Sequence, residues 1–94
     1  MDYDVIIIGG GAAGISAALW CDELGLNALL LEASAELGGQ LLWVYNRIEN
    51  HLGSAAKNGR DLRNVFVRQI KNRRFAVSLQ SEISDINLEK KEVR

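Results

Sequence analysis

The 94-residue sequence predicts an α/β domain built on a parallel strand–helix–strand unit. Three observations predict it. A short apolar, β-branched run is closed by glycines, a helical pattern about three turns long follows, and a second apolar run comes after the helix. An apolar run of this kind is too short for a helix and is typical of a buried strand in a parallel sheet.

The expected first strand, residues 3–8, leads directly into glycines with the spacing G-x-G-x-x-G. Gly9 permits a tight turn off the strand, Gly11 lets the backbone approach a ligand without a Cβ in the way, and Gly14 lets the helix pack close to the sheet. The N-terminus of that helix offers unpaired N–H groups and the positive end of the helix dipole to an anion. This order is the Rossmann-like dinucleotide-binding arrangement.

The helix is expected to stop at Gly25, after which the chain turns back into a second parallel strand, residues 28–32. Glu32 closes that strand. A carboxylate at this position can accept hydrogen bonds from both hydroxyls of an adenosine ribose and repels a 2′-phosphate, which favours FAD or NAD over NADP. In the alternative interpretation the turn is a plain βα connection and Glu32 is a solvated acid at a strand end.

Residues 33–43 lose the regular pattern and contain Gly38-Gly39 followed by the amide side chain of Gln40. Such a loop can bring backbone close to something flat or extended, or it can be an ordinary surface turn. The residues alone favour neither interpretation.

A second helix is expected at about residues 59–72, with Asn58 as its cap and Asp61 completing a pair that resembles a capping box. Apolar residues recur on one helical face, which should cover the sheet; they are Leu62, Val65, Phe66 and Ile70. The basic residues that gather between 57 and 74 are interpreted as a solvated helix face, with a docking patch for a partner as the alternative.

Two further strands are expected, at residues 75–79 and 83–88. The second of these begins an antiparallel β hairpin across 89–91 into 92–94, where a strand edge is left short of its partner. The chain is therefore expected to be a single domain, residues 1–94, with a parallel part over about 1–80 and the start of a hairpin over about 81–94.

Composition excludes several classes of protein. Hydrophobic residues make up 48% and charged residues 24%, an ordinary globular composition, and the net charge of −1 argues against a nucleic-acid or membrane-surface binder. Cys21 is the only cysteine, so no internal disulfide can form, and we interpret it as a packing residue. The first residues lack a signal-peptide pattern and no apolar run is long enough to span a bilayer, so a cytoplasmic location is expected.

Four spaced motifs together resemble a known family: DVIIIGGGAAG at 4–14, LLLE at 29–32, GGQL at 38–41 and IENHLG at 48–53. They look like the FAD-binding N-terminal part of the thioredoxin reductase group, within the pyridine nucleotide-disulfide oxidoreductases. The resemblance covers residues 3 to about 72. It implies that the cofactor is FAD, a choice over NAD that the residues alone do not make.

The resemblance also implies roles for individual residues. It gives the FAD pyrophosphate to Gly9, Gly11, Ala12, Ala13 and Gly14, the adenosine ribose to Glu32, the flavin half to Gly39 and Gln40, and the isoalloxazine edge to Asn50. No catalytic or metal-ligating residue is assigned.

The sequence departs from the family pattern at two places. Ala12 stands where the family usually has Pro, a mild change because Pro would only pre-set the first helical turn. His51-Leu52 replaces an aromatic residue followed by Pro, so the loop beside the flavin is expected to be set differently. His51 itself is interpreted as a surface or packing histidine rather than a proton donor to flavin.

The family's disulfide reductases also need a returning strand that completes the FAD site, a second nucleotide-binding unit for NAD(P)H, and a Cys-x-x-Cys pair. The sequence contains none of them, so relative to the family the fold is expected to be incomplete and the chain alone to be catalytically incomplete.

Two functions stay open: the FAD-binding part of a thioredoxin-reductase-like oxidoreductase, or a non-catalytic module that binds NAD or ADP, or that self-associates. The expected partner is a second copy of the chain or the remainder of the oxidoreductase, because two helices cannot cover both faces of the sheet. Neither nucleic acid nor membrane is expected as a partner.

Overall fold

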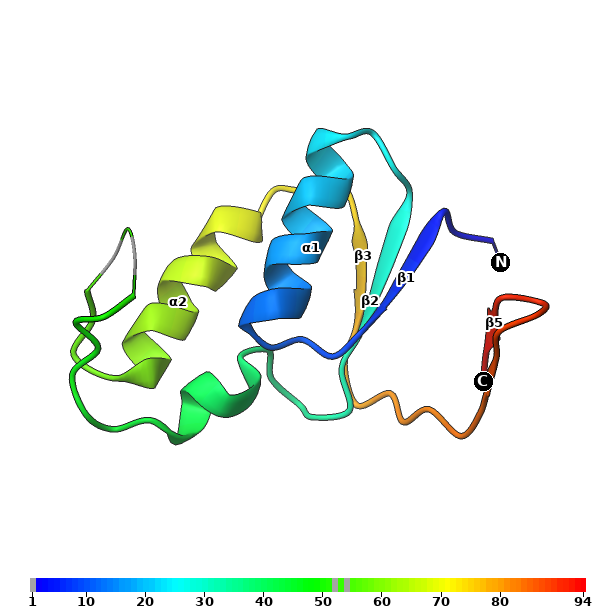
Figure 1. Cartoon of the computed structure of the whole chain (residues 1–94). Helices are drawn as coiled ribbons and strands as arrows, with labels where there is room; N and C mark the ends of the chain where they lie inside the picture. Colours follow the sequence, from blue (N-terminus) through cyan, green and yellow to red (C-terminus); the bar gives the residue numbers. More distant parts are fainter. Residues whose placement is uncertain (1, 52, 54) are drawn as a thin grey trace.

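The computed structural model describes residues 2–51, 53 and 55–94. Two helices stand beside a small sheet, and a separate strand pair lies at the other end of the molecule, close to the N-terminus (Figure 1). Along the chain the elements are β1 (Val5–Ile8), α1 (Ala12–Glu23), β2 (Ala28–Leu31), the 3₁₀ helix η1 (Gly39–Trp43), α2 (Gly59–Ile70), β3 (Ala76–Ser78), β4 (Ile86–Asn87) and β5 (Glu92–Val93).

The main sheet has the strand order β1–β2–β3, and both of its strand pairs are parallel. Ile7 is in register with Leu30, and Leu30 with Val77. The strands β4 and β5 pair antiparallel in a sheet of their own. The predicted α/β class, with a parallel βαβ unit and the start of an antiparallel hairpin, is confirmed.

Each strand is shorter than the sequence pattern predicted. The second strand, for example, was expected over residues 28–32, yet β2 ends at Leu31. The backbone of Glu32 still donates a hydrogen bond to the Ser78 carbonyl oxygen at 3.0 Å, but its side chain accepts one from the Ser34 N–H and so closes a turn. A polar side chain that bonds to nearby backbone competes with the strand ladder, which ends the strand one residue early.

Helix termini follow the sequence signals closely. Gly25 has a φ of +74°, and its N–H donates to the Asp22 carbonyl oxygen at the end of α1. At the start of α2, Asn58 Oδ1 accepts a hydrogen bond from the Asp61 N–H at 2.9 Å, so the predicted cap is confirmed. This cap fixes where α2 begins and therefore where its side chains point.

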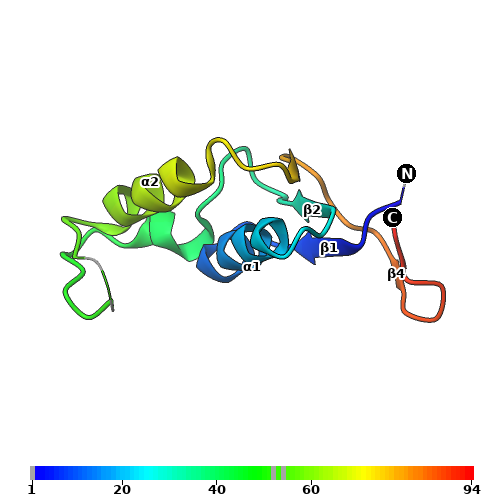
Figure 2. The same cartoon turned by 90° about the horizontal axis from the view of Figure 1, so that it is seen from above.

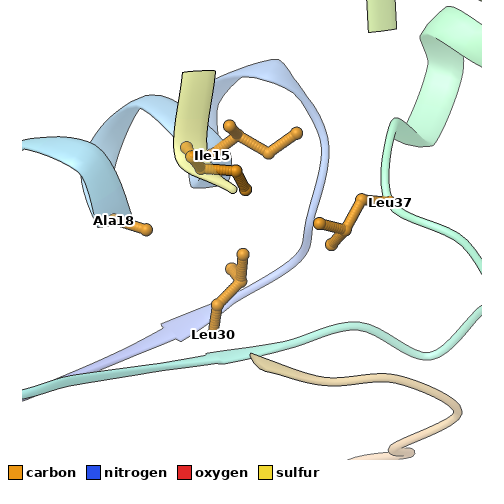
Figure 3. Packing of buried hydrophobic residues seen from close by; sticks show 5 residues of the cluster. Ile15, Ala18, Leu30 and Leu37 are labelled. Carbon is orange, nitrogen blue, oxygen red and sulfur yellow. The ribbon is translucent and has the colours of Figure 1, made fainter. Parts of the chain in front are cut away.

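A core of five buried residues joins the sheet, both helices and the loop after β2: Ile15, Ala18, Leu30, Leu37 and Ile70. Figure 3 shows Leu37 reaching from the loop toward Ile15 of α1 and Leu30 of β2. Burying a side chain as completely as Leu30 is worth about 1.5–3 kcal/mol. The loop that precedes η1 is therefore anchored in the core and is not a free surface turn.

The apolar face of α2 does not cover the sheet as predicted. This helix packs against α1 and η1 (Figure 2). Ile70 in its last turn is buried in the core that contains Leu30, and Phe66 and Val67 pack against that core. The reason lies at its first residue, where the Gly59 N–H donates to the Val44 carbonyl oxygen at 2.7 Å and a Cβ would collide with the Leu41 carbonyl oxygen. The start of α2 thus packs on η1. The sequence pattern did not predict this contact.

The sheet face opposite the helices is incompletely covered. A hollow of about 400 Å³ separates Ile6, Leu29 and Leu31 from the chain segment that carries Ile83 and Val93. Across the described part of the chain, no helix combines the length and apolar character needed to cross a membrane.

Candidate functional site

A cavity of about 640 Å³ lies where the chain leaves β1 and β2. Eight of the nine residues to which the family resemblance gave a cofactor role line this cavity: Gly9, Gly11, Ala12, Ala13, Gly14, Glu32, Gly39 and Gln40. Segments far apart in the sequence therefore meet here, as expected at the carboxyl edge of a parallel sheet. Its volume falls in the usual range of small-molecule sites.

The N-terminus of α1 opens onto this cavity. Gly11 is the N-cap, and it has no side chain to satisfy the first N–H groups of the helix. The first turn also contains no acidic residue, and Ala12 and Ala13 are exposed. Unpaired N–H groups and the helix dipole together favour a bound anion at this point.

The protein requires glycine at Gly9 and at Gly14 for different reasons, and does not require it at Gly11. Gly9 has a φ of +103°, a conformation that side chains disfavour. A Cβ on Gly14 would collide with the Gly9 carbonyl oxygen, so this glycine permits the close packing of α1 on the turn. A Cβ on Gly11 would come no closer than 3.9 Å to the Gly39 Cα, so Gly11 is not required by packing within the protein. Because Gly11 lines the cavity, its missing side chain leaves that part of the cavity open.

Glu32 is held against the glycine turn by its carboxylate. One oxygen accepts a hydrogen bond from the Gly10 N–H at 2.8 Å and the other from the Ser34 N–H at 2.7 Å. These bonds, the one from Ser34 foremost, lower the pKa of Glu32 below its ordinary value of 4.5. The group is ionised at neutral pH, and a carboxylate has further lone pairs with which to accept hydroxyl donors from a ligand.

The Gly38-Gly39 loop lies directly against the first glycine turn. The Gly38 N–H donates to the Gly10 carbonyl oxygen at 2.8 Å, and a Cβ on Gly39 would lie 3.0 Å from the Gly11 Cα. Both loop glycines have positive φ, +130° and +54°. The loop does make a close backbone approach, and what it approaches is the protein's own glycine turn. Its approach to something flat or extended stays a prediction.

Further residues line the cavity that the sequence reasoning did not select. They are Ile8, Gly38, Leu41 and Val44. Three of them are apolar: Ile8 ends β1, Leu41 lies within η1, and Val44 directly follows η1. Together they form a hydrophobic wall of the cavity. The motif GGQL pointed to this segment, but the 3₁₀ turn that brings Leu41 to the wall has no distinctive sequence pattern.

Asn50 is not among the residues that line this cavity. It is exposed on the long connection between η1 and α2. Its neighbour His51 packs its ring on Phe66, with ring centroids 5.6 Å apart, and borders a separate cavity of about 200 Å³ beside Ile15. The interpretation of His51 as a packing residue agrees with this contact. Leu52, the other departure in this loop, lies outside the described residues.

The described residues offer no cluster of three or more side chains suited to a metal ion. Cys21 is buried in α1, on a helix turn remote from the glycine loops. What the cavity provides is a set of backbone donors, one carboxylate and an apolar wall.

Comparison with known proteins places this geometry among flavoproteins. A family model described as FAD dependent oxidoreductase matches residues 4–90. A ferredoxin–NADP reductase of Limosilactobacillus fermentum is 37% identical over 86 residues, which cover 89% of this chain and 26% of that protein. A thioredoxin reductase of Treponema pallidum is 48% identical over 54 residues, 57% of this chain and 17% of the relative.

Solved structures give the same result. The thioredoxin reductase of Lactococcus lactis superposes with a TM-score of 0.80 and 28% identity over 92% of this chain and 27% of its own. That of T. acidophilum gives a TM-score of 0.75 and 31% identity, over 87% and 26% of the two chains. The chain thus spans about a quarter of the length of these relatives.

Proposed function

This chain belongs to the FAD dependent oxidoreductase family, and from that premise we propose that it is the FAD-binding portion of a thioredoxin-reductase-like flavin oxidoreductase. The observation that carries the proposal is the single cavity that joins the α1 N-terminus, the carboxylate of Glu32 and the Gly38-Gly39 loop. An elongated dinucleotide needs these three kinds of contact at once.

The residues present fit FAD. We assign its pyrophosphate to the N–H groups of Ala12, Ala13 and Gly14, where the missing Cβ of Gly11 leaves room. Glu32 accepts the ribose hydroxyls, and Gly39 and Gln40 take the flavin half along the apolar wall of η1. The role of Asn50 at the isoalloxazine edge stays a prediction, because Asn50 lies outside the cavity.

Bound FAD supplies an isoalloxazine that accepts and passes on a pair of electrons. The residues of this chain would stabilise the pyrophosphate with backbone N–H donors, fix the ribose and hold the two halves of the cofactor at a set distance. We propose that the binding site for a reductant and the thiol chemistry of a reductase require parts beyond these 94 residues, since the sequence has one cysteine and one glycine fingerprint.

The second candidate function is a non-catalytic module that binds NAD or ADP. The glycine turn and Glu32 would serve any adenine dinucleotide equally well. The features that favour FAD are the Gly38-Gly39 loop and the apolar residues Leu41 and Val44, which extend the cavity beyond the adenosine half.

Titration of the purified chain with FAD and with NAD separates the two candidates. We expect about one equivalent of FAD to bind non-covalently, with a flavin absorption band that stays with the protein through gel filtration, and NAD to bind far more weakly. Protein that binds NAD and FAD equally well supports the adenosine-binding module. Protein that binds neither contradicts both candidates.

We also propose that the partly bare sheet face is covered by association, with a second copy when the chain is alone. Ile6, Leu29 and Leu31 face a hollow where a parallel sheet normally carries a second layer. Sedimentation velocity is expected to show a dimer whose population rises with concentration. A monomer at every concentration would contradict the proposed self-association.

A further inference from the structure

Arg63 of α2 is bonded to the loop that carries Gly38 and Gly39. Its Nε donates a hydrogen bond to the Leu37 carbonyl oxygen at 2.7 Å, and its Nη2 lies 3.9 Å from a carboxylate oxygen of Glu36. The Arg63 side chain is only 19% exposed. A partly buried hydrogen bond from a charged donor is among the stronger polar contacts in proteins, so this bond restrains the loop at Leu37.

The apolar stem of Arg63 makes a second contact with the same loop. A Cβ built on Gly38 would lie 2.6 Å from the Arg63 Cγ, so the stem lies directly over the Gly38 backbone. Gly38 is buried and has a φ of +130°. Arg63 thus holds the carbonyl before Gly38 and covers Gly38 itself.

The contacts continue from this loop to the first glycine turn. The Gly38 N–H donates to the Gly10 carbonyl oxygen, and Gly39 lies against Gly11. A continuous set of contacts therefore runs from α2 through Arg63 and the loop to the turn at the α1 N-terminus. The neighbouring Arg60 pairs with Glu36 at 2.8 Å, but both side chains are about half exposed, and an exposed pair of this kind restrains little.

The geometry points to Arg63 as a positioning residue. It sets the distance between the Gly38-Gly39 loop, to which we assign the flavin half, and the glycine turn at the α1 N-terminus, to which we assign the pyrophosphate. This inference rests on the proposed function, because it concerns the same FAD site. Arg63 does not line the cavity, so it acts through the loop and not by touching the cofactor. The guanidinium suits this role, because one nitrogen holds Leu37 while another faces Glu36, which a single ammonium group cannot reproduce.

Arg63→Met tests the inference, since it keeps an apolar stem over Gly38 and removes the donors. FAD and ADP affinities are measured by titration calorimetry on the 94-residue chain. The dissociation constant for FAD is expected to rise about tenfold, in keeping with the loss of a charge-assisted bond. That for ADP should change less than about twofold, because ADP needs only the first turn and Glu32.

Arg68→Met is the matched control, because Arg68 is exposed near the end of the same helix, and it should leave both affinities unchanged. Arg63→Lys keeps the charge and the stem, is expected to show the same FAD-selective loss to a smaller extent, and serves if the Met variant does not fold. An unchanged FAD affinity in the Arg63 variants, or equal losses for FAD and ADP, overturns the positioning role. Wild-type protein that binds no FAD overturns the proposed function and this inference together.

Discussion

Gly11→Ala is expected to fold like the wild-type chain and to lose most of its affinity for FAD. The Gly11 backbone is extended, with φ −77° and ψ −169°, and a Cβ there would meet only the Gly39 Cα at 3.9 Å, so alanine fits the protein. That same Cβ would stand where we place the pyrophosphate. Forcing one methyl group into a filled site costs about 1–3 kcal/mol, which is about 5- to 150-fold in the dissociation constant.

Gly14→Ala is the matched comparison, and its expected defect is of another kind. Its Cβ would collide with the Gly9 carbonyl oxygen, so α1 must move away from the turn. We expect the free energy of unfolding to fall by about 3 kcal/mol, at the upper end of overpacking effects. Urea unfolding and FAD titration of both variants check the pair. A Gly11→Ala chain that binds FAD normally would show that the pyrophosphate does not lie at this turn.

Glu32→Gln is expected to weaken FAD binding by about 1–3 kcal/mol, because charge-assisted hydrogen bonds to the ribose are lost. Titration calorimetry measures this loss. Glu89→Gln serves as the control, since Glu89 is exposed on the turn between β4 and β5. If the affinity of Glu32→Gln equals that of the wild type, Glu32 does not hold the ribose.

The same variant should change how stability depends on pH. Hydrogen bonds from the Ser34 and Gly10 N–H groups lower the pKa of Glu32 in the folded chain, so the ionised group stabilises the fold above its ordinary pKa of 4.5. This contribution is lost as the pH falls from 4.5 through the lowered folded value. The stability difference between wild type and Glu32→Gln, measured by urea unfolding, should therefore shrink below about pH 4.5.

The features that the sequence predicted depend on contacts between residues that are close together in the chain. The spacing of Gly9, Gly11 and Gly14 after a β-branched strand predicted the turn and the start of α1, because the positive φ of Gly9 and the close approach of Gly14 to the Gly9 carbonyl oxygen are local to that turn. Asn58 predicted its helix start because a side-chain cap is a contact between near neighbours. The place of Glu32 in the cavity was predictable for the same reason, since Glu32 directly follows β2.

The features that the sequence did not predict depend on contacts between distant segments. Leu37 sits in an aperiodic loop, and only the fold shows that it enters the core with Leu30. The docking of α2 on η1 arises where Gly59 meets Leu41, two residues with no shared pattern. Arg63 belonged to a run of basic residues interpreted as solvated, and its bond to the Leu37 carbonyl oxygen becomes visible only once the loop is folded.

The most direct test of the account is the response of individual backbone amides to FAD, followed by ¹H–¹⁵N NMR of the labelled chain. Because the pyrophosphate is placed on the first turn of α1, the amide signals of Ala12, Ala13 and Gly14 should shift most, together with those of Gly10 and Gly39. ADP should reproduce the shifts at α1 but not the one at Gly39. Shifts confined to other parts of the chain, with the α1 amides unmoved at saturating FAD, would contradict the central claim.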